Sequence, residues 1–254
     1  MRISAPSAAI ALMAPAILAA PLATAPFAAA VAAPAAQVQA GAAVDQQPPS
    51  MQMMEQAARQ YAAELRHLHG AAFEQAFMGA MIPHHAAAVA MAHMELTRGS
   101  RPQVKALAAQ IITAQNHEIA QMTSWLRTWY HLTPAQAAQR APASLRNANA
   151  TVATQMRAMT DHLTTVPAGS EFDVAFITAM IAHHKMAVTD ASTVPGRATH
   201  SQVITLARHI VATQSHQIHQ MTALLHAGHH MMGTVPPGPH MMSPGHHMTS
   251  PGDH

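Results

Sequence analysis

The chain contains no cysteine and only a small share of charged or aromatic side chains. Without cysteine it can form neither a disulfide nor a thiolate metal ligand, so packing or other ligands must stabilise the fold. Charged residues make up 9 % of the 254 residues, and the net charge is only +2. Because the basic residues are scattered rather than gathered into a patch, we expect no nucleic-acid partner.

The sequence also lacks an uninterrupted apolar run of the length that a membrane-spanning helix needs, which is about 20 residues. Its apolar N-terminal segment, residues 8–20, follows Arg2 and is broken by proline. Small residues come next, and Val38-Gln39-Ala40 has the form that a signal peptidase cleaves. We therefore predict a signal peptide over residues 1–40 and a periplasmic or secreted protein with no stable membrane span after cleavage.

Histidine and methionine, by contrast, are abundant, with 21 and 20 residues respectively. The imidazole nitrogen and the thioether sulfur are neutral donors that suit copper well and suit magnesium or calcium poorly. In the absence of thiolates, methionine is the softest ligand that the chain can offer. The composition therefore predicts a metal-binding protein, with copper as Cu(I) the expected ion and silver, nickel or zinc as alternatives.

An internal duplication dominates the organisation of the chain. Residues 73–126 align with residues 172–225 without a gap, at a constant offset of 99 (172 − 73). In each copy apolar residues recur at helical spacing in two segments, which a Gly- and Pro-containing break separates. No alternating strand pattern occurs in the mature chain. The fold class is therefore predicted to be all-α, with two duplicated helical hairpins packed as an antiparallel four-helix bundle.

The remaining segments divide the chain further. Residues 41–70 are predicted to be a linker and an N-terminal helix, and residues 71–226 the duplicated four-helix metal-binding domain. Within that domain, the connecting segment should hold a helix that starts at Thr133-Pro134 and a second short helix over residues 151–163. Residues 227–254 are rich in Gly, Pro, His and Met without periodicity, so we predict a flexible, disordered tail.

The sequence Met-Ile-x-His-His occurs once in each copy. On a helix, the methionine lies one turn before both histidines, and antiparallel hairpins would bring the two motifs together near the bundle axis. A core histidine is more often hydrogen-bonded than metal-bound, and a core methionine usually fills space. The duplication of the whole motif nevertheless favours a shared metal ion, with six candidate ligands: Met81, His84, His85, Met180, His183 and His184.

Weaker candidate ligands lie outside this motif. The second helix of each copy adds His117, Met122, His216 and Met221, and Gln115 and Gln214 could orient an imidazole. Clusters at Met91-Ala92-His93-Met94 and at Met156, Met159 and His162, like Asp190, Ser192 and Thr193 in the second copy, are expected to be surface or accessory groups. The tail repeats a histidine-methionine theme suited to metal capture, with candidate ligands His229, His230, Met231, Met232, His240, Met241, Met242, His246, His247 and Met248.

At these residues the chain resembles the bacterial domain-of-unknown-function family 305, whose signature joins a duplicated MIPHH-like helix to a helix reading roughly Q-x-x-E-I-x-x-M. The first copy matches it, and the second departs at Ala182 and Gln217. The resemblance covers residues 71–226. It implies a ferritin-like four-helix bundle, usually exported, with some members that bind copper in the bacterial periplasm. The matching residues of the first copy are Met81, Pro83, His84, His85, Gln115, Glu118, Ile119 and Met122.

The leading hypothesis is a periplasmic copper-binding protein that sequesters or delivers the metal and is not an enzyme. Its expected partners are the metal ion and other periplasmic copper-handling proteins, and a homodimer is left open. One alternative is a ferritin-like di-metal oxidase, although the Glu-x-x-His pairs of that chemistry are absent from the paired helices. The other alternative is a structural helical bundle that binds no metal tightly.

Overall fold

The computed structural model of the protein describes the backbone of residues 51–232 and the side chains of residues 52–227. Within this range the chain forms helices and no strand, which confirms the predicted all-α class. None of these helices is both long and apolar enough to cross a membrane. The helices are α1 (Met51–Leu65), α2 (Gly70–Arg98), α3 (Pro102–Tyr130), α4 (Pro134–Arg140), α5 (Ala143–Thr165), α6 (Ser170–Ala191) and α7 (Ser201–Met232).

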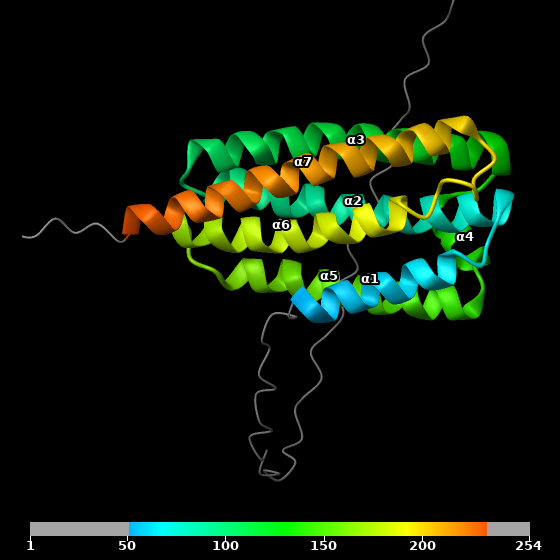
Figure 1. Cartoon of the computed structure of the whole chain (residues 1–254), viewed down its shortest axis with the longest axis horizontal. Helices are drawn as coiled ribbons and strands as arrows, with labels where there is room; N and C mark the ends of the chain where they lie inside the picture. The colour runs from blue at the N-terminus through cyan, green and yellow to red at the C-terminus, as the bar shows by residue number, and fades with distance from the viewer. Residues whose placement is uncertain (1–50, 233–254) are drawn as a thin grey trace, which may run out of the picture. The chain divides into compact units, whose positions relative to one another are not determined.

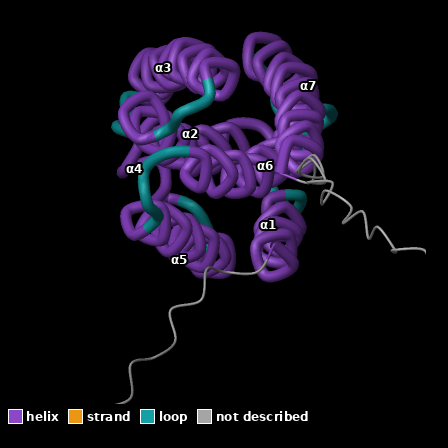
Figure 2. The backbone as a smooth tube through the Cα atoms, turned by 90° about the vertical axis from the view of Figure 1, so that its left-hand side faces the viewer, coloured by secondary structure: helices purple, strands orange, loops and turns teal. Residues whose placement is uncertain are grey.

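The helical unit has three layers when it is viewed end-on (Figure 2). Helices α3 and α7 form one outer layer, α2 and α6 form the central layer, and α1 and α5 form the other outer layer, with α4 beside α2. The two central helices run in opposite directions, as do α3 and α7 (Figure 1). The central layer is therefore covered on both faces.

The central position of α2 and α6 follows from their sequences. Phenylalanines near the start of each helix, including Phe73 and Phe172, are fully buried, and buried residues cover most of the circumference of both helices apart from an exposed stripe, which in α2 includes Ala86 and Ala90. A helix with so wide an apolar surface must be covered on more than one side. The four repeat helices are present as α2, α3, α6 and α7. They do not make up the whole fold as a four-helix bundle would, because α1 and α5 cover the second face of the central pair and α4 lies beside α2.

Several predicted boundaries need correction. Helix α4 begins as predicted, with Thr133 and Gln136 forming a reciprocal capping box, but α5 begins at Ala143 rather than near residue 151. Helix α7 continues to Met232, beyond the predicted start of the tail at residue 227. A single glycine costs a helix only about 1 kcal/mol, so the glycine in this segment was too weak a stop signal. The predicted signal peptide and the tail beyond residue 232 lie outside the described residues.

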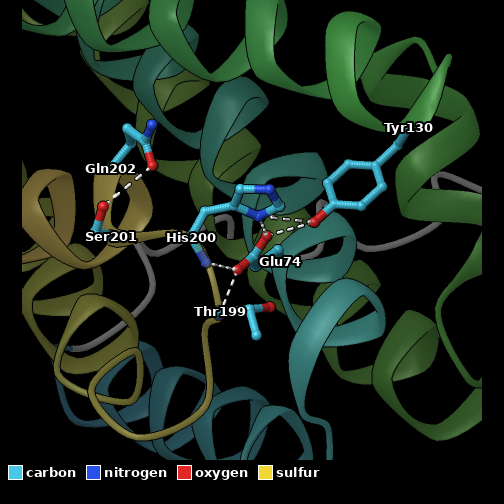
Figure 3. Close-up of polar contacts among 6 residues, drawn as sticks. All are labelled: Glu74, Tyr130, Thr199, His200, Ser201 and Gln202. Carbon is cyan, nitrogen blue, oxygen red and sulfur yellow. Dashed lines mark hydrogen bonds and ion pairs between the residues drawn. The ribbon is translucent and has the colours of Figure 1, made fainter.

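The two hairpins are joined by reciprocal helix caps. Glu74 of α2 accepts hydrogen bonds from the backbone N–H groups of Thr199 (2.6 Å) and His200 (2.7 Å), which precede α7. It also accepts one from the His200 ring at 2.6 Å and one from the Tyr130 hydroxyl (Figure 3). Burial alone would raise the pKa of Glu74, but these hydrogen bonds lower it. A charged carboxylate at the start of a helix also interacts favourably with the helix dipole.

The second cap is the repeat-related counterpart of the first. Asp173 of α6 accepts hydrogen bonds from the backbone N–H groups of Ser100 (2.9 Å) and Arg101 (3.2 Å), which precede α3. The Ser100 hydroxyl donates a further bond of 2.6 Å. The offset of 99 relates both the carboxylates (173 − 74) and the capped residues (199 − 100). Each hairpin therefore caps the second helix of the other, which fixes α2 and α6 in register.

Candidate metal centre

The four histidines of the repeated motif meet where α2 and α6 pack together. All four are buried, with 3 % of His84 exposed and 0 % of His85, His183 and His184. The rings of His84 and His183 lie with centroids 3.7 Å apart and planes tilted by 40°. Within each pair the centroids are 6.1 Å (His84 and His85) and 6.2 Å (His183 and His184) apart. The structure thus brings together the imidazoles that the duplication predicted, and we call them the histidine cluster.

Two of these rings are oriented by side chains from the layer of α3 and α7. The Nε2–H of His85 donates to Glu118 Oε2 over 2.7 Å, and the Nε2–H of His184 donates to Gln217 Oε1 over 2.7 Å. Glu118 and Gln217 occupy equivalent positions of the repeat (217 − 118 = 99). Partners of this kind fix the tautomer of an imidazole and the direction of its free lone pair. Both rings therefore present a bare Nδ1.

The same tautomer holds for His183, whose Nε2–H donates to the backbone carbonyl of His84 over 3.0 Å. A neutral imidazole carries one N–H, so Nδ1 of His183 is a lone-pair acceptor. None of the Nδ1 atoms of the cluster has a hydrogen-bond partner, and neither does Nε2 of His84. One of the two His84 nitrogens carries the N–H of its neutral ring, so the cluster holds buried nitrogen lone pairs without donors and one N–H without an acceptor.

Burial keeps three histidines of the cluster, His84, His183 and His184, neutral. Burial, reinforced by the neighbouring imidazoles, lowers the pKa of His84 and of His183 well below the ordinary value. Burial likewise lowers the pKa of His184 to about 4, against the opposing effect of its bond to Gln217. A metal ion binds the neutral imidazole, so at neutral pH these rings are already in the ligating form.

The other predicted ligands are placed differently. Met81, Met122, Met180 and Met221 are buried in the core, whereas His117 and His216 are exposed and take no part in the cluster. The five-residue spacing between each of these histidines and the buried methionine that follows puts them on different sides of the helix. Gln115 and Gln214 are buried, but their amides make no hydrogen bond to any histidine. The side chains of residues 229–232 and all of residues 240–248 lie outside the described range.

Sequence reasoning missed most of the buried polar groups. Met91, Met156, Met159 and Asp190 were expected to be surface or accessory groups, and the structure buries them, with exposed fractions of 7 % or less. Besides Glu118, four carboxylates are buried: Glu74, Glu95, Asp173 and Asp190. Periodicity within one helix could not show this, because the covering residues come from helices distant in sequence.

A surface pocket of about 520 Å³ lies between α3 and α7. His117 and His209 line it, and His209 Nε2 lies 3.9 Å from Glu118 Oε1. Glu118 thus lies between the exposed His209 and the buried imidazole of His85. The repeat-related positions of His209 and Glu118 are Gln110 in the first copy and Gln217 in the second, so the two related pairs differ in charge.

Among residues 52–227, no three His, Asp or Glu side chains surround a common point that would suit a metal ion. The carboxylates Glu74 and Asp173 are committed to helix caps.

Comparison with known proteins places these features in context. The family model described as Domain of unknown function (DUF305) matches residues 26–123 and 74–225. A DUF305 fragment from Deinococcus radiodurans is 28% identical, with a TM-score of 0.51, covering 63% of this chain and 99% of that one. A DUF305 protein from Streptomyces coelicolor is 25% identical, with a TM-score of 0.50, covering 61% and 92%. CopM in the Cu(I)-bound form is 32% identical, with a TM-score of 0.49, covering 61% and 96%. No curated protein matches the chain significantly.

Proposed function

We propose that this chain, which belongs to the DUF305 family, binds a soft metal ion at the histidine cluster and sequesters or delivers it. Copper as Cu(I) is the expected ion, and Ag(I) is its closest substitute. The observation that carries this proposal is the set of buried Nδ1 lone pairs without hydrogen-bond partners. An unsatisfied buried polar atom costs about 1–3 kcal/mol, and a bound cation would satisfy several of these atoms at once.

The chemistry of the donors favours a soft ion over a hard one. The cluster offers neutral nitrogens, and the thioethers of Met81 and Met180 are buried one helical turn away. Calcium and magnesium prefer several oxygen ligands, while Cu(I) accepts a low number of neutral nitrogen and sulfur ligands. Glu118 and Gln217 would hold the imidazoles of His85 and His184 in orientation through their hydrogen bonds.

Binding rather than catalysis is the proposed role. A di-metal oxidase would need carboxylates beside the imidazoles, and the described residues bring only Glu118 into contact with the cluster. In a purely structural bundle the imidazole lone pairs would stay unsatisfied, and nothing would offset the free-energy cost of burying them. We further propose that the protein works in the periplasm or outside the cell, after removal of the predicted signal peptide.

The test is a Cu(I) titration of the full chain against a competing chelator, combined with thermal unfolding. The variant His84→Gln/His183→Gln removes the central pair of the cluster. The variant His117→Gln/His216→Gln is the matched control, because it removes an exposed pair at equivalent repeat positions. Metal held in the folded core must raise the melting temperature, whereas capture by a tail that binds equally in the unfolded state does not.

We expect Cu(I) to stabilise the wild type and the control variant, and to have little effect on the melting temperature of the cluster variant. Far-UV circular dichroism before titration checks that each variant is folded. Equal stabilisation of both variants would show that the histidine cluster is not the copper site. An absence of stabilisation in the wild type would favour the structural bundle.

A further inference from the structure

A small cavity lies next to the side chain of His84, between the central layer and the layer of α1 and α5. Its lining comes from four helices: Tyr61 of α1, Met81 and His84 of α2, Met156 of α5 and Asp190 of α6. The cavity volume is about 10 Å³, which is room for one occupant the size of a water molecule or an ion. The lining thus combines two thioethers, an imidazole and a carboxyl group with the phenol of Tyr61 and the amide of Asn149.

Polar atoms around this cavity lack partners. Both ring nitrogens of His84 are buried without a hydrogen bond, and so is Oδ1 of Asp190, a residue that is only 5 % exposed. The Tyr61 hydroxyl, by contrast, donates to the backbone carbonyl of Ala76. The unsatisfied atoms are therefore those of the imidazole and the carboxyl group, and something that enters the cavity has to satisfy them.

The donor set selects the kind of occupant. Thioethers are soft ligands that Cu(I) and Ag(I) accept and that calcium, magnesium and manganese do not. A cation in a buried cavity also needs an opposite charge nearby. Asp190 is the one acidic residue in the cavity lining. A soft monovalent cation therefore suits the two thioethers, the imidazole and the carboxyl group of the lining.

We propose that this cavity is a Cu(I) or Ag(I) site in which Met81, His84 and Met156 are the ligands and the unpartnered Oδ1 of Asp190 faces the ion. This inference rests on the proposed function and names the residues that would hold the ion. Met156 lies outside the duplicated segments, and the repeat counterpart of Asp190 is Met91 (190 − 99). The same ligand set is therefore not available around His183, so we expect one such site in each chain.

The experiment compares Met156→Leu with Met159→Leu in the full chain. Both methionines are buried on α5, with exposed fractions of 7 % and 4 %, but only Met156 lines the cavity. Met→Leu exchanges in a core usually cost less than about 1.5 kcal/mol, so both variants should fold. The probe is Ag(I), followed by the methyl NMR signals of isotopically labelled methionine and by competition titration.

We expect substoichiometric Ag(I) to shift the methyl signals of Met81 and Met156. Loss of the Met156 sulfur should weaken the tightest site by on the order of 10- to 100-fold, as removal of a metal-site group commonly does, and Met159→Leu should bind as the wild type does. Unchanged binding in Met156→Leu, or an equal loss in both variants, would overturn this proposal. If Met156→Leu binds normally while His84→Gln/His183→Gln does not, the cluster stands without the cavity. If neither loses affinity, the proposed function fails as well.

Discussion

Replacement of Glu95 by glutamine should stabilise the protein at neutral pH. Glu95 lies on α2 with no exposed surface, close against Gly99, where an added Cβ would come within 1.9 Å of Glu95 Oε1. Neither of its carboxyl oxygens accepts a hydrogen bond from a donor. Its neighbour Asp173 already accepts hydrogen bonds from Ser100 and Arg101. Two carboxyl groups in contact repel each other when both are charged, so one of them must keep its proton. Glu95 is the one that keeps it.

Burial, followed by the hydrogen bond to Asp173 and the charge of Asp173, raises the pKa of Glu95 from 4.5 to about 8. Between these two values the folded chain holds a proton that the unfolded chain has released. The free energy of unfolding therefore falls as pH rises, by about 1.4 kcal/mol per pH unit from this group. From pH 4.5 to pH 7 the loss amounts to on the order of 3 kcal/mol.

Glu95→Gln keeps the shape of the side chain and a donor towards Asp173 but cannot ionise. The assay is urea unfolding of both proteins at several pH values from 4 to 8, followed by far-UV circular dichroism. At pH 7 the variant should be more stable by up to roughly 3 kcal/mol, and the two should converge near pH 4. Parallel stability curves across this range, or a variant less stable at pH 7, would refute the assignment of the proton to Glu95.

Three further changes have defined outcomes. Asp173→Ala removes the cap of α3 and should lower the free energy of unfolding by about 1–3 kcal/mol, measured by urea titration; no loss would mean that water replaces the cap. Gly79→Ala would place a Cβ 2.7 Å from the backbone nitrogen of Ala138, so the contact of α2 with α4 should open at a cost of about 1–3 kcal/mol, seen as a lower melting temperature. Glu118→Gln gives the first copy the residue that the second copy has at this position. The Cu(I) affinity, measured by chelator competition, should then fall by on the order of 10-fold. Unchanged affinity would show that Glu118 does not orient a ligating imidazole.

Much of the histidine cluster was predictable because its two halves are copies of each other. The spacing within Met-Ile-x-His-His and the offset of 99 were enough to predict that His84 and His183 converge. The identity of the orienting partners was harder to predict. Glu118 and Gln217 lie 33 residues from the histidines they contact, and the neighbouring glutamines at 115 and 214 looked equally suitable on the helix surface.

The covering layer could not be predicted from periodicity. Helices α1, α4 and α5 have no counterpart in the repeat, so nothing in the sequence indicated which face of α2 and α6 they cover. The burial of Met156 and Asp190 depends on that layer, and so does the cavity beside His84. The reciprocal caps could not be predicted from local sequence patterns either, because Glu74 and Thr199 are 125 residues apart. Local patterns thus determined the helices, while contacts over long sequence distances determined which polar groups are enclosed.

The most direct test of a soft-metal site in the histidine cluster is a two-bond proton–nitrogen NMR spectrum of the ¹⁵N-labelled full chain with Ag(I). Silver nuclei are magnetic, so each nitrogen that binds silver shows a splitting that identifies it. The structure predicts splitting at Nδ1 of cluster histidines, while the Nε2–H groups that donate to Glu118, Gln217 and the His84 carbonyl keep their signals. Splitting confined to exposed histidines such as His117, or to those of the C-terminal segment, would contradict a metal site in the cluster.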